Sequence, residues 1–118
     1  MPNQAPALDA VFHALACPAR RVIVERLTRG AASVSQIAEP LSMALPSVMQ
    51  HLRVLEDSGL VHSEKVGRVR TCRIDPAVLT DAEHWIARQR AVWEARLDRL
   101  DDYLKDLKRK EKNRDDPS

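Results

Sequence analysis

The sequence has few aromatic residues and no long hydrophobic run. Only 3% of its 118 residues are aromatic, too few for a surface that stacks unpaired nucleic-acid bases. No apolar run approaches the roughly 20 residues that cross a bilayer, and the first residues, MPNQAPALD, lack the basic flank and apolar stretch of a signal peptide. We therefore expect a cytoplasmic protein with no membrane partner and one modest core.

Cysteine is also scarce, and neither sign of charge dominates. Cys17 and Cys72 stand too far apart for a zinc knuckle or a CxxC redox pair, so we expect free thiols. Nineteen basic and 17 acidic residues give a net charge of +2, too little for the whole molecule to act as a polycation. Between residues 62 and 74, however, four basic residues and one acidic residue give +3. Any nucleic-acid signal must therefore be local.

The apolar spacing predicts three short helices in the first part of the chain. The first covers residues 8–16, and the second begins at Pro18 and ends before Gly30. Ser33 and Gln36 have the spacing of a capping box, which starts a third helix of about two turns.

A fourth helix and a basic hairpin follow. The helix opens at Pro46 and ends at Gly59. Its apolar stripe is Leu45, Val48, Leu52 and Leu55. Residues 60–66 and 69–74 are expected to form two strands around a basic tip, Gly67-Arg68, and Asp75-Pro76 breaks the second strand.

A last helix is expected over about residues 80–110, which contain neither Gly nor Pro. Five large apolar residues step along it by 4, 3, 4 and 3, the spacing of a coiled-coil seam: Trp93, Leu97, Leu100, Leu104 and Leu107. Because the small domain cannot cover this seam, we expect a homodimer. We expect the domain over residues 8–110, a flexible N-terminus over 1–7 and a disordered charged tail over 111–118.

Two short helices followed by a hairpin with a basic tip are typical of a winged helix-turn-helix, which is mainly α with a β-hairpin wing. Three segments, HALACPARRVIVERL, SVSQIAEPLSMALPSVMQHLRVLEDSGLV and EKVGRVRTCRIDP, resemble the ArsR/SmtB family of bacterial winged-helix repressors. The resemblance covers about residues 8–108. It implies a transcriptional repressor that binds an imperfect palindromic DNA operator as a homodimer and leaves it when a signal arrives. The first and last helices would form the dimer interface, with Leu8, Val11 and Phe12 joining the seam.

The resemblance also assigns DNA contacts by position. Ser47, Gln50 and His51 fall on the recognition helix, and Arg53 falls where a phosphate contact is common. Gln50 suits an adenine edge because its amide donates and accepts together. Arg68 and Arg70 would contact the DNA backbone from the wing. The alternatives are a solvated helix face, a His51 that packs on the core edge, and wing arginines that only solubilise an edge strand.

Neither metal site of the family is complete in this sequence. Residues 36–39 contain no Cys-x-Cys pair, and the last-helix site reads Asp81, Glu83, Glu94 and Leu97, without imidazole. We expect no metal and no cofactor.

The cysteines are candidate thiol sensors. Cys17 stands at the start of the second helix beside Arg20 and Arg21, which should lower its pKa. Cys17 and Cys72 could then support a thiol-responsive or soft-metal-responsive repressor. The alternative is that both are small packed residues.

The sequence also bears on two other function classes. An enzyme built on His13 and Cys17 lacks an oxyanion site, a third orienting group and a phosphate loop, so catalysis is not expected. A winged helix that contacts protein through its seam remains an alternative, and it would leave Gln50, Arg53, Arg68 and Arg70 dispensable.

Overall fold

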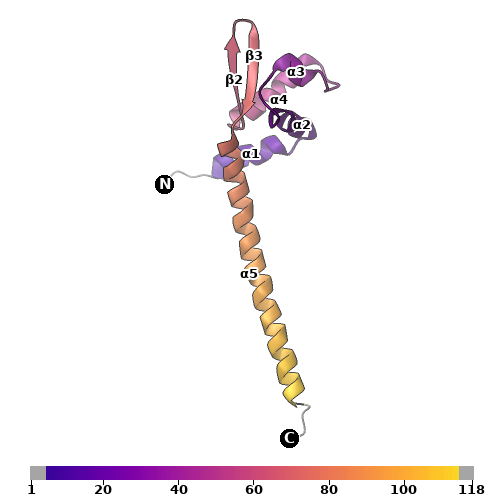
Figure 1. Cartoon of the computed structure of the whole chain (residues 1–118), viewed down its shortest axis with the longest axis vertical. Helices are drawn as coiled ribbons and strands as arrows, with labels where there is room; N and C mark the ends of the chain where they lie inside the picture. The colour runs from indigo at the N-terminus through magenta and orange to yellow at the C-terminus, as the bar shows by residue number, and fades with distance from the viewer. Residues whose placement is uncertain (1–4, 115–118) are drawn as a thin grey trace. The chain divides into compact units, whose positions relative to one another are not determined.

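The computed structural model describes residues 5–114. Its elements, in chain order, are α1 (Ala5–Leu15), α2 (Pro18–Leu27), β1 (Ala32–Ser33), α3 (Val34–Ala38), α4 (Leu45–Asp57), β2 (Val61–Val66), β3 (Val69–Ile74) and α5 (Pro76–Arg114) (Figure 1). The predicted helix-turn-helix followed by a hairpin wing is confirmed. The chain divides into two compact units after Ala82, so α5 begins in the first unit and continues into the second.

Local signals set the starts of three helices, as predicted. In α3, Ser33 Oγ accepts from the N–H of Gln36 at 3.2 Å and the Gln36 side chain accepts from the N–H of Ser33 at 2.9 Å, which completes the capping box. Helices α2 and α4 each have a proline in their first turn. Proline fits there because its missing N–H would have no partner within the helix. Ala44 occupies the N-cap position of α4, but its methyl side chain cannot make a capping hydrogen bond.

The wing is an antiparallel hairpin of β2 and β3 whose register pairs Val61 with Ile74 and Val66 with Val69. Gly67, in the tight turn between them, has φ +63°, a left-handed conformation that favours glycine. The sequence reading missed β1, which pairs with β3 and completes a three-stranded sheet in the order β1-β3-β2. A two-residue strand leaves no periodic pattern to read.

The core of the first unit lies between the first four helices and the sheet. Its largest fully buried side chains are Ile23, Leu27, Ile37, Leu55, Leu60, Val48, Val61 and Cys72. Leu45 was predicted on the apolar stripe of α4, but the structure leaves it 54% exposed. Leu45 is the first residue of α4, so it lies at the edge of the packed face.

The ends of the chain differ from the sequence prediction. Helix α1 begins at Ala5, within the segment expected to be flexible, and α5 begins at Pro76 and reaches Arg114, four residues beyond the expected range at each end. Residues 111–114 are therefore helical and not part of a disordered tail. Lys105 with Asp101 and Arg109 with Asp106 form ion pairs at helical spacing near this end. Residues 1–4 and 115–118 lie outside the described residues.

Asp75 explains the early start of α5. Its Oδ1 accepts from the N–H of Ala77 at 3.0 Å, so it caps the helix while Pro76 occupies the first position. Its Oδ2 lies 2.8 Å from Nε2 of His62 on β2, and its N–H donates to the Leu60 carbonyl at 2.8 Å. The hydrogen bond from His62 lowers the pKa of Asp75, and the N–H of Ala77 acts in the same direction.

We expect Asp75→Asn to change the acid sensitivity of the fold. A lowered pKa means that the ionised carboxylate stabilises the folded state above the ordinary aspartate pKa of about 3.9, and that this contribution is lost as the pH falls below it. The variant should therefore melt below the wild type at neutral pH, and the difference should shrink below about pH 4. Thermal unfolding followed by circular dichroism across this range measures it. A difference that stays constant with pH would contradict the role assigned to Asp75.

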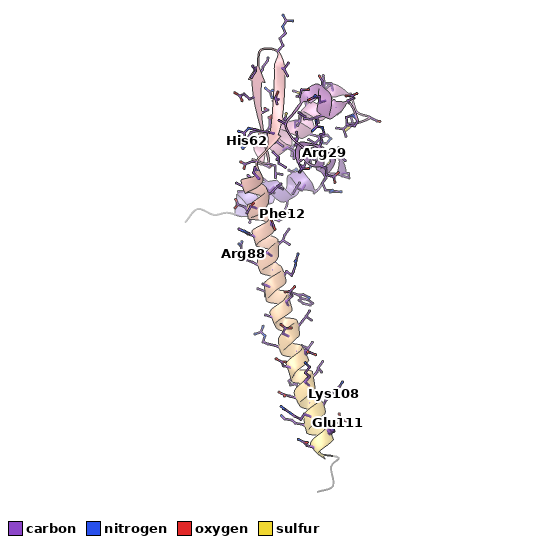
Figure 2. All side chains as sticks on the ribbon, in the orientation of Figure 1. Phe12, Arg29, His62, Arg88, Lys108 and Glu111 are labelled. Atoms are coloured by element: carbon purple, nitrogen blue, oxygen red, sulfur yellow. The ribbon has the colours of Figure 1, made fainter. Side chains whose placement is uncertain are left out.

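The second unit consists of α5 from Glu83 onward, and all its described side chains are exposed. Figure 2 shows side chains projecting along this stretch, with Arg88, Lys108 and Glu111 labelled. Within residues 5–114, no helix combines the length and apolar character that a membrane span requires.

Candidate nucleic-acid interface

Helix α4 presents a polar face opposite its buried side. Val48, Leu52 and Leu55 are buried and anchor the helix to the core. Gln50 and Arg53, three residues apart, are exposed, and Ser47 is half-buried in the first turn. The helical period places these three residues on one face. The core packing of α4 therefore orients the residues that the sequence assigned to DNA contact.

The surface is hollowed where α4 meets the wing. One hollow of about 410 Å³, the helix hollow, is lined by Pro46, Met49, Gln50, Leu52, Arg53, Glu56 and Arg70. A second of about 410 Å³, the wing hollow, is lined by Ser33, Val34, Ser35, Leu45, Met49, Lys65, Arg68, Val69 and Arg70. Met49 and Arg70 belong to both. The fold thus brings Gln50 and Arg53 together with Arg70, and Arg68 lines the adjoining wing hollow.

The cations around these hollows differ in their surroundings. Arg53, Lys65 and Arg68 are exposed, and none of them makes a salt bridge within the described part of the chain. Three of the cations that border the hollows therefore have no anionic partner between residues 5 and 114. The sequence reading did not assign Lys65, although the local charge of residues 62–74 already contained it. An extended anion such as a nucleic-acid backbone would meet these cations from both α4 and the wing.

Arg70 has an anionic partner. Its Nη1 lies 3.9 Å from Oε1 of Glu56, on the last turn of α4. The same Oε1 accepts a hydrogen bond from the hydroxyl of Ser63 on β2. Arg70 is 44% exposed and Glu56 is 26% exposed, so the carboxylate is the more enclosed of the two. Glu56 therefore ties both wing strands to α4, a role that the sequence pattern did not reveal.

His51 is engaged inside the first unit. Arg20 of α2 approaches His51 Nδ1 with Nη1 at 3.3 Å. The Nε of Arg20 donates to the Ala14 carbonyl at 2.7 Å, and the Nη2 of Arg20 donates to the His13 carbonyl at 3.0 Å. Arginine cannot accept a hydrogen bond, so Nδ1 must be the acceptor and the ring proton must be on Nε2. Arg20 thus links the end of α1 to α4, and His51 is half-buried in this junction.

Cys17 lies at the N-cap of α2, as predicted, and is half-buried. The N–H of Arg20 lowers the pKa of the Cys17 thiol, and desolvation opposes this effect. The N–H of Ala19 and the charges of Arg20 and Arg21 also lower this pKa. This is the predicted direction, and the N–H groups of the helix N-terminus contribute more to it than the arginine charges do.

Cys72 is not accessible in this structure. It is fully buried on β3, opposite Ala32 of β1 and Ser63 of β2. Burial raises the pKa of the Cys72 thiol, and the charge of Glu56 acts in the same direction. The sensor role considered for Cys72 does not fit a buried thiol with a raised pKa, whereas the packing alternative does. The described residues contain no cluster of His, Cys, Asp or Glu able to hold a metal ion.

The residues assigned to the dimer interface have different exposures. Val11 is only 3% exposed and belongs to the core of its own unit, so its side chain has little surface left for a partner. Leu8 and Phe12 are half-buried. The five seam residues of α5 are between 43% and 59% exposed. Ile86, also exposed and seven residues before Trp93, extends the same spacing by one heptad, a signal present in the sequence.

Comparison with known proteins yields similar regulators. A family model described as a helix-turn-helix domain matches residues 15–64. The HTH-type transcriptional regulator Rv2034 of Mycobacterium tuberculosis is 38% identical over 84 residues, which cover 68% of this chain and 78% of that protein. The transcriptional repressor SdpR of Bacillus subtilis is 28% identical over 79 residues, covering 67% and 88%. The crystal structure of an ArsR family transcriptional regulator, RHA00566, matches with a TM-score of 0.72 and 50% identity over 75% of this chain and 97% of that one.

Proposed function

The chain belongs to the ArsR family of winged helix-turn-helix regulators and is a DNA-binding transcriptional repressor, and we propose that it binds an imperfect palindromic operator as a homodimer. One observation carries the proposed binding surface. Exposed Gln50 and Arg53 of α4 border the helix hollow, and exposed Lys65 and Arg68 of the wing border the wing hollow. The two hollows adjoin, because Met49 and Arg70 line both. A base-reading side chain and phosphate-binding cations are thus available on one surface.

In this proposal α4 enters the major groove and the wing lies along the backbone. Gln50 reads a base edge, because its amide offers a donor and an acceptor in one plane. Ser47, in the first turn of α4, carries a hydroxyl that suits a phosphate oxygen. Arg53 and Arg68 bind phosphate without reading sequence. Because Arg20 holds Nδ1 of His51, this ring offers only its Nε2–H to DNA.

The homodimer is proposed from α5. Residues 93–107 expose five large apolar side chains at coiled-coil spacing, and a second copy of the chain offers the same seam. Two copies related by a two-fold axis present two α4 helices to successive major-groove segments, about 34 to 36 Å apart. An operator with two inverted half-sites matches this symmetry.

We expect Gln50→Ala to lose affinity mainly for the operator. Removing the amide should cost about 1 to 3 kcal/mol for each base pair that it reads, with little effect on random DNA. The operator is first identified by sequencing the genomic fragments that the purified protein retains. Fluorescence anisotropy with this operator and with a scrambled duplex then measures both affinities. An equal loss on both duplexes would reject base readout by Gln50.

Arg68→Ala is the matched control on the wing. Because a phosphate contact carries no sequence information, this variant should weaken binding to operator and scrambled duplex by about the same factor. Its affinity should also depend less steeply on salt, since fewer counterions are released. If neither variant changes the affinity for any duplex, the surface contacts another kind of partner, such as a protein.

A further inference from the structure

Glu56 is the one carboxylate that borders the helix hollow within the described residues. A carboxylate on a phosphate-binding surface repels the phosphate. Its presence there therefore suggests that it has another role. Its Oε1 accepts from Ser63 and lies 3.9 Å from Arg70 Nη1. The contacts of Glu56 are thus with the wing, not with solvent alone.

The geometry keeps the carboxylate in place. The Ser63 hydroxyl holds the oxygen that faces Arg70, and Glu56 is only 26% exposed. An exposed salt bridge by itself contributes little to stability, so a phosphate could displace a mobile carboxylate from an arginine. Here the Ser63 hydroxyl holds the Glu56 carboxylate beside Arg70. The charges of Glu56 and Arg70 therefore cancel at this point of the hollow. Arg53 and Arg68 have no such partner among the described residues.

We propose that Glu56 limits the affinity of this surface for DNA phosphates by cancelling the charge of Arg70, so that it sets how tightly the repressor holds non-specific DNA. This inference rests on the proposed function. Arg70 then serves mainly to hold the wing against α4, unlike Arg68 at the wing tip. The sequence had assigned both arginines the same backbone contact, and the position of Glu56 separates their roles.

The test is the salt dependence of binding to a random-sequence duplex by full-length Glu56→Gln. The amide keeps an oxygen that accepts from Ser63 and removes only the charge. Affinity near 0.1 M salt should rise about tenfold, and the slope of log affinity against log salt should steepen by about 1.8, or 0.9 for each of two protomers. A merely structural role would not steepen this slope.

Two controls locate the effect. Asp57→Asn makes the same charge change at the next position of α4, which does not border either hollow, and should raise the affinity much less. The double variant Glu56→Gln/Arg70→Gln replaces two opposite charges with two neutral amides. It should return the affinity and the slope to wild-type values, because the net charge of the hollow is then unchanged.

The opposite results would overturn the inference. If Glu56 instead directs Arg70 onto a phosphate, Glu56→Gln will bind less tightly with a shallower slope, and the double variant will be as weak as Arg70→Gln. An unchanged slope in Glu56→Gln, or an equal gain in Asp57→Asn, would also reject it. A wild-type protein that binds no duplex at any salt concentration would refute the proposed function itself, which is a separate outcome.

Discussion

Replacing Leu100 with glutamate is expected to convert the repressor to a monomer and to lower its operator affinity by at least about a hundredfold. Leu100 stands in the middle of the exposed apolar seam of α5. A glutamate there would place two carboxylates opposite each other in the proposed coiled coil, where they would lose hydration and repel one another. A monomer engages one half-site, so the gain from binding two linked half-sites disappears.

Light scattering should report a mass that falls from about twice 13.3 kDa to 13.3 kDa. Ala95→Glu is the matched control, because it adds the same charge to the same helix outside the seam and should remain dimeric. A wild-type monomer at micromolar concentration would contradict the proposed dimer. A Leu100→Glu variant that stays dimeric would show that another surface joins the two copies.

Leu55→Ala is expected to destabilise the first unit by about 2 to 5 kcal/mol. Leu55 is 0% exposed, on the buried side of α4. Truncation removes buried apolar atoms and leaves a cavity that close-packed neighbours fill only in part. This loss is a large share of the roughly 5 to 15 kcal/mol that stabilises a typical domain. Because α4 carries the residues proposed to contact DNA, operator binding should be lost under any condition that unfolds the first unit.

Urea unfolding without DNA measures this difference, with Leu45→Ala as the control on the same helix. Leu45 is largely exposed, so its truncation should change the free energy of unfolding by less than about 0.5 kcal/mol. The sequence pattern assigned Leu45 and Leu55 to one apolar stripe. Equal costs for the two variants would mean that the pattern, and not the observed burial, describes α4 correctly.

Signals within a few residues of one another were sufficient to predict much of the fold. The capping box at Ser33, the proline in the first turn of α2 and the glycine in the wing turn each act on the adjacent backbone. The resemblance to winged-helix repressors was likewise local, since it rested on contiguous segments. The Asp75-Pro76 pair is also a local signal: the sequence pattern predicts that it ends a strand, and in the structure it also begins α5.

By itself, the sequence determined the order of the main elements, the face of α4 that carries Gln50 and Arg53, and the spacing of the seam, because helical and strand periods depend only on neighbouring residues. Tertiary structure alone decided which residues are buried and which charges meet. Val11 joins the core, Arg20 reaches His51, and Glu56 reaches Arg70. Each of these outcomes depends on a surface supplied by a distant segment, so no local pattern can specify it.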